Sequence, residues 1–184
     1  MIILSKIFCK FKVFLKKIRG KNRAVIFDRD GTLNIDYGYV GEIEKFELFP
    51  DVIPSLKKLE NAGFLLIVIT NQSGVGRGFF GIENVEKIHN HLKKLLLANG
   101  ICLAKIYTCP HAPEERCKCR KPKTLLFEKA IKEFSLDPQK CYSIGDKETD
   151  IIPAEKLKMK GILLGRHCKN LKEAVEIILK NESE

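Results

Sequence analysis

Long apolar runs are missing from this chain of 184 residues. A membrane-spanning helix needs roughly 20 consecutive apolar residues, and no stretch approaches that length, so we do not expect an integral membrane protein. The chain also lacks tryptophan, internal repeats and low-complexity linkers. The rest of the composition, 45% hydrophobic and 30% charged, excludes a collagen-like or wholly disordered chain. The length suits one domain with a sizeable core.

Acidic residues are absent from residues 1–23, although eight lysines and arginines lie there. This segment carries +8 of the formal net charge of +10, so the remainder of the chain carries only +2. A strongly basic protein often binds nucleic acid. Here the basicity belongs to a tail while the body is nearly neutral, so we expect no nucleic-acid partner.

The tail itself has apolar residues at intervals of three and four, which predicts a basic amphipathic helix over residues 1–22. Such a helix fits a membrane surface or a partner's groove. The alternatives are a helix packed on the domain's own surface and an extension without function. Lysines interrupt the apolar run and no small-residue cleavage site follows, so we expect no secretory signal. We expect a cytoplasmic monomer, with peripheral attachment to the inner membrane surface as one role for residues 1–20.

Residues 23–184 form the predicted globular domain, in which apolar runs alternate with helical patterns. The expected strands are residues 24–27, 64–69, 104–108, 141–144 and 161–164. The expected helices are residues 51–62, 82–99, 123–135, 148–158 and 170–181. Continuously apolar strands separated by helices predict an α/β fold, a Rossmann-like parallel sheet with helices on both faces. These elements already occupy the spaces between the polar motifs, which leaves no room for a large cap domain.

Polar residues follow four of the predicted strands directly. The pairs are Asp28 and Asp30, Thr70 and Asn71, Cys109 and His111, and Gly145 and Asp146. In open parallel sheets, ligands bind beyond the carboxyl ends of the strands. The sequence therefore predicts a functional site at this edge of the sheet.

The two carboxylates of Asp28 and Asp30 indicate a metal-dependent reaction. Like charges held close together need a cation, and oxygen ligands with open positions suit Mg²⁺. Asp146 offers a further carboxylate next to Lys147, and residues 70–74 offer a hydroxyl, amides and backbone N–H groups for phosphate oxygens. With Lys121 as a fixed positive charge, this set meets the needs of displacement at phosphorus.

A second group of residues has the spacing of a zinc site. Three thiols and one imidazole occur within eleven residues, namely Cys109, His111, Cys117 and Cys119. Four such ligands suit tetrahedral Zn²⁺ with no open position, so we expect a structural zinc that stabilises the loop leading to Arg120 and Lys121. A disulfide is the alternative, which the missing secretory signal disfavours. His89 and His91 lie on a predicted polar helix, and we expect both to be exposed.

The motifs together resemble those of the haloacid dehalogenase superfamily. The matching segments are residues 28–32, Thr70 with Asn71, Lys121, and residues 145–150. The resemblance implies that Asp28 is the nucleophile that forms an aspartyl-phosphate, and that Asp30 is the general acid and base. It also implies that Thr70 and Lys121 hold the phosphoryl oxygens, and that Asp28, Asp146 and the Asp30 carbonyl bind Mg²⁺, with Lys147 adjacent. Asp150 is expected to orient Lys147 or metal-bound water.

The zinc loop and two further segments resemble a narrower group within this superfamily. Residues 109–122 are similar to the subgroup of histidinol-phosphate and heptose 1,7-bisphosphate phosphatases, and residues 34–40 and 70–78 are similar to the heptose enzymes. The implied substrate is a sugar bisphosphate that loses its 7-phosphate, in the synthesis of nucleotide-activated heptose for surface polysaccharide. Arg120 would hold the second phosphate. The implied substrate contacts are Asp28, Arg29, Asp30, Asp36, Tyr37, Gly38, Tyr39, Thr70, Asn71, Gln72, Ser73, Arg120 and Lys121.

Three other functions stay open at this stage. The short segment between His111 and Cys117 is similar to the histidinol-phosphate branch, which makes histidinol phosphate the alternative substrate. A nucleic-acid 3′-phosphatase shares the first two motifs, but the nearly neutral body has no charged track for a strand. The complete catalytic set argues against a non-enzymatic, membrane-recruited adaptor.

Overall fold

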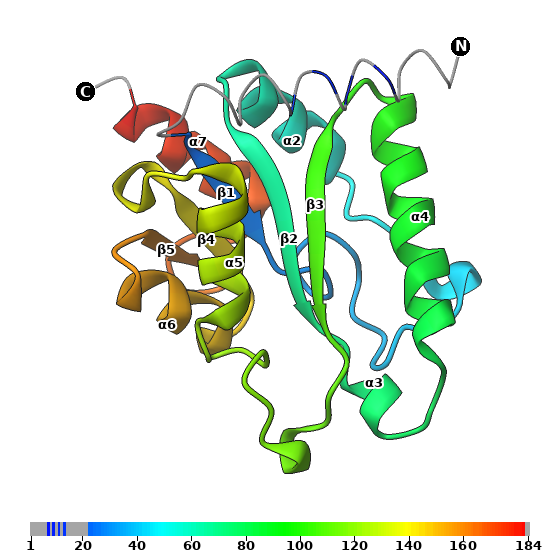
Figure 1. Cartoon of the computed structure of the whole chain (residues 1–184). Coiled ribbons are helices and arrows are strands. Elements are labelled where there is room, and N and C mark those ends of the chain that lie inside the picture. Colours follow the sequence, from blue (N-terminus) through cyan, green and yellow to red (C-terminus); the bar gives the residue numbers. More distant parts are fainter. Residues whose placement is uncertain (1–6, 8, 10, 12, 14–21, 183–184) are drawn as a thin grey trace.

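The computed structural model describes residues 22–182 together with Ile7, Cys9, Phe11 and Val13 (Figure 1). Apart from these single positions and Asn22, the predicted helix over residues 1–22 and its membrane attachment lie outside the described residues. Ile7 and Phe11 are exposed, whereas Val13 packs against the core. No helix in the described part of the chain is long and apolar enough to cross a membrane.

Five parallel strands form one sheet in the order β3-β2-β1-β4-β5. Their bounds are β1 Ala24–Phe27, β2 Leu65–Asn71, β3 Leu103–Cys109, β4 Tyr142–Gly145 and β5 Lys160–Leu163. Each overlaps a predicted strand, so the prediction of a parallel sheet is confirmed. The most apolar runs, which became β1 and β2, are neighbours in the middle of the sheet, where both faces are covered.

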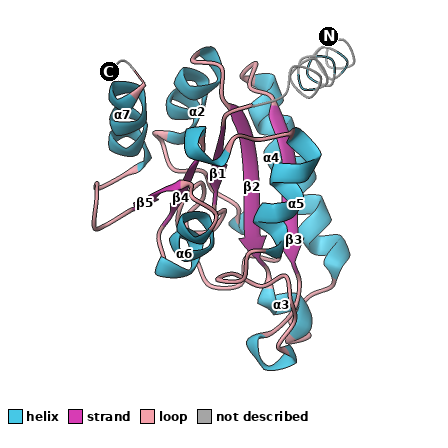
Figure 2. Ribbon diagram, turned by 60° about the vertical axis from the view of Figure 1, so that its left-hand side comes forward, coloured by secondary structure: helices cyan, strands magenta, loops and turns pink. Residues whose placement is uncertain are grey.

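Helices cover both faces of the sheet, as Figure 2 shows. Their bounds are α2 Val52–Asn61, α3 Ser73–Gly76, α4 Ile82–Ala98, α5 Leu125–Phe134, α6 Glu148–Lys156 and α7 Leu171–Asn181. Core side chains of α2, α4 and α7 pack together on one face, and those of α5 and α6 pack on the other. The longer helices coincide with the predicted ones, and the described chain contains no inserted cap domain.

The side chains of strand β1 alternate between the two hydrophobic cores, one on each face of the sheet. Val25 and Phe27 point into the core with α2, α4 and α7, while Ala24 and Ile26 point into the core with α5 and α6. The alternation follows from the two-residue period of a strand. All four side chains are at most 1% exposed. Burial of one Phe or Ile side chain stabilises the fold by about 1.5–3 kcal/mol. Strand β1 is therefore a rigid base for Asp28, which follows it.

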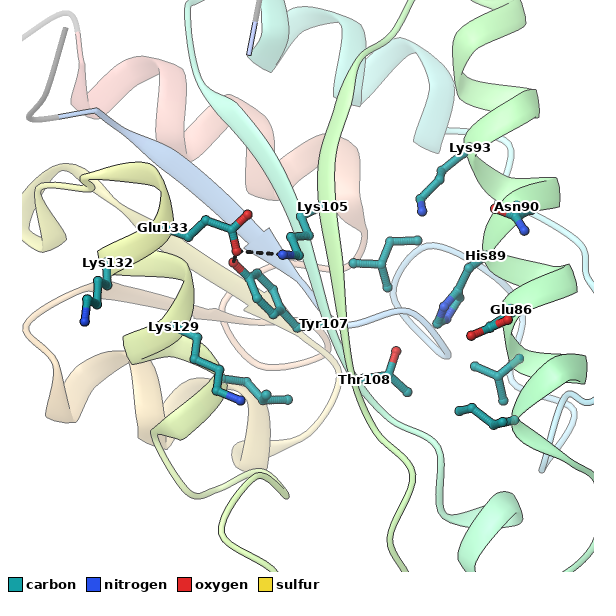
Figure 3. Close-up of a pocket in the computed structure, with 14 residues that line it drawn as sticks. Glu86, His89, Asn90, Lys93, Lys105, Tyr107, Thr108, Lys129, Lys132 and Glu133 are labelled. Carbon is teal, nitrogen blue, oxygen red and sulfur yellow. Dashed lines mark hydrogen bonds and ion pairs between the residues drawn. The ribbon is translucent and has the colours of Figure 1, made fainter. Parts of the chain in front are cut away.

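Strand β3 is an edge strand, and a cavity of about 990 Å³ runs along it between α4 and α5 (Figure 3). Lys105 and Tyr107 project from β3 and share one partner there. The Glu133 carboxylate accepts from the Lys105 ammonium at 2.6 Å and from the Tyr107 hydroxyl at 2.7 Å. Charged side chains on an edge strand oppose pairing with another chain.

The expectation that His89 is exposed is wrong. The side chain is only 7% exposed and lies on the same stripe of α4 as Val85 and Leu92. Figure 3 shows it pointing from α4 toward β3. Burial, with the nearby charge of Arg29, lowers the pKa of His89 to about 3, so the imidazole is neutral.

Candidate active site

The polar side chains that follow the strands meet at one edge of the sheet, because β1 lies between β2 and β4. Asp28 follows β1, Thr70 and Asn71 end β2, and Asp146 follows β4. A cavity of about 260 Å³ opens at this edge. It is lined by Asp28, Asp30, Asp36, Gly38, Tyr39, Val40, Asn71, Gln72, Ser73, Gly74, Arg120, Lys121, Lys147, Thr149 and Asp150.

Three of the predicted substrate contacts are not part of this lining in the described chain. Arg29 is fully buried behind Asp30. Thr70 is also buried, and its hydroxyl oxygen accepts a hydrogen bond from the Gln72 amide at 2.8 Å. Tyr37 is 57% exposed, and its hydroxyl donates to Glu47 at 3.1 Å. Direct contact with substrate at these positions stays a prediction.

Lys121 is the positive centre of the cavity floor. Its ammonium lies 2.7 Å from an oxygen of Asp28 and 2.7 Å from an oxygen of Asp150, and it donates to the Ile69 carbonyl at 2.6 Å. Burial lowers the pKa of Lys121, but the two carboxylates outweigh that effect and raise it. The ammonium therefore stays charged where negative oxygens gather.

Asp28, the predicted nucleophile, lines the cavity. Burial raises its pKa to about 6, against the opposing influence of the Lys121 ammonium. One oxygen is held by Lys121, and the side chain reaches the cavity from the rigid end of β1. A carboxylate fixed in this way can attack an electrophile without first ordering its own side chain.

Asn71 fixes the loop that carries Lys121. Its side-chain oxygen accepts from the Lys121 backbone N–H at 3.1 Å, and its side-chain nitrogen donates to the Lys121 carbonyl at 3.2 Å. Both polar ends of the amide are thus engaged by one peptide segment 50 residues further along the chain. Asn71 also lines the cavity, so its predicted contact with the substrate stays a prediction beside this role in holding the Lys121 backbone.

Three carboxylates on this edge form a group that could bind a metal ion. One oxygen from each of Asp28, Asp146 and Asp150 lies within 4.8 Å of the others. Asp146 Oδ1 is buried and has no hydrogen-bond partner among the described residues. Hard oxygen donors of this number and charge fit Mg²⁺, with positions left for substrate and water. Lys147 lies next to this group, its ammonium 3.5 Å from Asp146 and 3.4 Å from Asp36.

Gly31 permits the close approach of the first loop to Asp146. Its φ is +82°, and a Cβ at this position would lie 2.5 Å from Asp146 Oδ2. Any other residue would be strained in this conformation and would also collide with the carboxylate. The glycine that follows Asp30 in the sequence therefore lets the first loop pack against a carboxylate of this group.

The side chain of Asp30 is turned toward a different set of partners. It lines the cavity, and its carboxylate accepts hydrogen bonds from Arg29, Asn34 and Gln72. The three aspartates of the metal group do not include it. The two carboxylates of the first motif therefore have distinct surroundings, one facing Lys121 and the other facing Arg29, as two different chemical roles require.

The second cluster of ligating side chains lies beside the active site. Sγ of Cys119 is 3.2 Å from Sγ of Cys109 and 3.3 Å from Nδ1 of His111, and Cys117 is 3.5 Å from Cys109. The four ligand atoms lie within 4.8 Å of one another, so the cluster could hold a metal ion. None of the described cysteines forms a disulfide. Arg120 follows the cluster and donates to the His111 carbonyl at 3.3 Å.

Known proteins are similar to this chain in sequence and in fold. A family model described as HAD-hydrolase-like matches residues 118–176. A D-glycero-beta-D-manno-heptose-1,7-bisphosphate 7-phosphatase from Haemophilus ducreyi is 42% identical over 151 residues, which are 78% of this chain and 83% of that protein. The chain belongs to the haloacid dehalogenase-like phosphatases. The predicted superfamily and enzyme class are thereby confirmed.

Two other similar proteins bear on the predicted alternatives. A histidine biosynthesis bifunctional protein from Campylobacter jejuni is 39% identical, but the match spans 78% of this chain and only 42% of that protein. The crystal structure of a D,D-heptose 1,7-bisphosphate phosphatase from B. bronchiseptica, in complex with magnesium and phosphate, has a TM-score of 0.79 and 25% identity. The match covers 87% of this chain and 99% of the B. bronchiseptica chain.

Sequence reasoning missed one contact of Asp150 and the contact made by Asn34. Asp150, expected to orient Lys147 or metal-bound water, accepts from the backbone N–H of Lys147 at 3.1 Å and also contacts the Lys121 ammonium. Asn34, which was assigned no role, donates to Asp30 at 2.9 Å. Asn34 lies four residues after Asp30 in a predicted loop, and this short separation is the sequence signal that indicates a contact between them.

Proposed function

We propose that this protein hydrolyses the 7-phosphate of D-glycero-β-D-manno-heptose 1,7-bisphosphate and leaves heptose 1-phosphate. The Haemophilus ducreyi relative is named for this activity. One observation on the site supports a bisphosphate in particular. Two of the three cationic side chains that line the cavity, Lys121 and Arg120, lie at separate positions, while the third, Lys147, pairs with Asp36 and Asp146. Lys121 is buried on the floor beside Asp28, and Arg120 is half-buried on the wall next to the zinc loop.

Lys121 and Arg120 would each bind one of the two phosphates. The phosphate to be removed would lie against Asp28, with its oxygens near Lys121. The phosphate that stays on the product would bind Arg120, whose planar guanidinium suits paired hydrogen bonds to phosphate oxygens. Asp36 and Tyr39, which also line the cavity, would contact the sugar that joins the two phosphates.

The reaction would proceed in two balanced steps. An Asp28 oxygen attacks phosphorus, the bond from phosphorus to sugar oxygen O7 breaks, and Asp30 gives its proton to that oxygen. Asp30, now ionised, then takes a proton from water as the water oxygen attacks the phosphorus of the aspartyl-phosphate. Inorganic phosphate leaves, and both Asp28 and protonated Asp30 are restored.

Two metal ions complete the proposal. Asp28 and Asp146, with the Asp30 carbonyl, would hold Mg²⁺, which when bound offsets the negative charge of the carboxylates and the phosphate. Cys109, His111, Cys117 and Cys119 would hold a structural Zn²⁺. The zinc would keep the loop rigid, and with it the position of Arg120.

A panel of three substrates tests the assignment. Phosphate release is measured in Mg²⁺ buffer with heptose 1,7-bisphosphate, histidinol phosphate and a 3′-phosphorylated oligonucleotide, and the heptose product is identified by ³¹P NMR. We expect the highest kcat/KM on the heptose bisphosphate and heptose 1-phosphate as product. A higher kcat/KM on histidinol phosphate would favour the alternative substrate predicted from the short segment between His111 and Cys117 and would overturn the proposal.

The nucleophile is tested separately with Asp28→Asn. This substitution keeps the size of the side chain and replaces the nucleophilic carboxylate by a neutral amide, so we expect no turnover of any substrate in the panel. Full activity in the variant would exclude an aspartyl-phosphate whatever the substrate.

A further inference from the structure

The carboxylate of Asp30 is enclosed by donors from three side chains. Nη2 of Arg29 lies 3.0 Å from both carboxylate oxygens, and Nε of Arg29 lies 3.2 Å from Oδ1. Nδ2 of Asn34 donates to Oδ1 at 2.9 Å, and Nε2 of Gln72 donates to Oδ2 at 2.7 Å. Each carboxylate oxygen therefore has at least two donors within hydrogen-bond distance.

The ion pair with Asp30 anchors Arg29 in the interior of the protein. Its side chain is 0% exposed, and Asp30 is the carboxylate that forms an ion pair with it. A buried guanidinium without a counter-ion would be strongly destabilising, because desolvation of a charge costs several kcal/mol. The adjacent carboxylate therefore holds the arginine in place, and the arginine fixes the direction of the carboxylate.

Gln72 ties this pair to the end of β2. Its Oε1 accepts from Nη2 of Arg29 at 3.0 Å, while its Nε2 donates both to Asp30 and to the Thr70 hydroxyl at 2.8 Å. The amide is 4% exposed and fully engaged. Its oxygen faces the cation and its nitrogen faces the anion, so the orientation of the amide matches the charges on both sides.

We propose that Arg29 and Gln72 are positioning residues that act through Asp30, rather than residues that contact the substrate. The proposal rests on the role of Asp30 as general acid in the proposed function. The donors around Asp30 fix its side chain in one direction at the cavity, so proton transfer to the leaving oxygen does not first require that side chain to be ordered.

The dependence on the leaving group separates this role from a structural one. A sugar alkoxide is a poor leaving group and needs the proton from Asp30, whereas a nitrophenolate leaves without one. The parameter to compare is kcat/KM, which covers only the steps up to departure of the leaving group. The substrates are heptose 1,7-bisphosphate and p-nitrophenyl phosphate, assayed with the full-length wild type, Arg29→Met and Gln72→Met.

We expect Arg29→Met to lower kcat/KM on the heptose substrate by about 100-fold, the lower range for general acid catalysis, through kcat and not KM. On p-nitrophenyl phosphate we expect a loss of less than about 3-fold, because that reaction does not need the proton. Gln72→Met removes one donor and should show the same pattern with a smaller loss. Arg77→Met is the control, since Arg77 is exposed and pairs with Glu114 outside the cavity.

Two results would overturn the proposal. Equal losses on both substrates would indicate a structural role, and a rise in KM alone would indicate direct substrate binding. The double variant Arg29→Met with Asp30→Asn should be no slower on the heptose substrate than Asp30→Asn, and an additive loss would also contradict it. If wild type prefers another alkyl phosphate, that ester replaces the heptose substrate, so failure of the substrate assignment is distinguishable from failure of this inference.

Discussion

His89 makes the stability of this protein depend on pH in a way that can be calculated. The ordinary pKa of histidine, 6.5, applies to the unfolded chain, whereas burial and the charge of Arg29 lower the pKa in the folded protein to about 3. Between these values the unfolded chain binds more protons, so the free energy of unfolding falls as the pH falls below 6.5. The loss continues until the pH reaches about 3.

The size of the effect follows from the two pKa values. Linkage gives about 1.4 kcal/mol for each full pH unit between them, which amounts to about 2 kcal/mol from pH 7 to pH 5. His89→Leu removes the titrating group and keeps an apolar side chain on the buried stripe of α4. We therefore expect the variant to gain about 2 kcal/mol relative to wild type over this range.

The measurement is urea unfolding of both proteins at pH 7, 6 and 5. Other groups, including the thiols of the metal cluster, titrate equally in both proteins and cancel in the difference. Val85→Ala, one turn earlier on α4 and also buried, is the control, because it shortens a side chain without removing a titrating group. Its difference from wild type should not change with pH. If His89→Leu and wild type lose equal stability from pH 7 to pH 5, the reasoning is refuted.

Three further substitutions test other parts of the structure. Lys121→Met should abolish turnover and destabilise the protein by about 3–5 kcal/mol in urea unfolding, because it leaves buried carboxylates unpaired; normal stability would contradict the ion-pair geometry. Cys117→Ser should reduce bound zinc, measured by mass spectrometry of anaerobically purified protein, and unchanged zinc would exclude this site. Gly74→Ala places a Cβ 2.4 Å from the Phe80 ring and should cost about 1–3 kcal/mol in thermal unfolding, whereas no loss would contradict this packing.

The fold was predictable because its signals are local. Apolar runs bounded by polar residues produced the strands within one or two residues of their observed bounds, and the polar residues after them reached one edge because the strands are parallel. His89 was misjudged although a local signal existed. A buried stripe on a helix has residues spaced by three and four, and this spacing joins Val85, His89, Leu92 and Leu96. The spacing therefore predicts that His89 is buried, although histidine as a residue type suggests exposure.

The contacts within the site were less predictable because they join distant segments. Gln72 lies 43 residues from Arg29, and Lys121 lies 93 residues from Asp28. Sequence motifs indicate that such residues belong to one site, but the choice of partner depends on how loops pack after the strands have assembled. A motif residue can therefore contact the substrate or hold a residue that does, and the two roles look alike in sequence.

The balance of charge at the site explains why a nearly neutral protein would need a metal ion. The carboxylates in or beside the cavity are Asp28, Asp30, Asp36, Asp146 and Asp150, and the cations are Arg29, Arg120, Lys121 and Lys147. Most of these cations already form ion pairs within the site. Arg29 pairs with Asp30, and Lys121 pairs with both Asp28 and Asp150. With all five carboxylates ionised, a phosphate dianion entering this cavity would meet a small excess of negative charge. A divalent cation reverses that sign, so phosphate binding and metal binding should depend on each other.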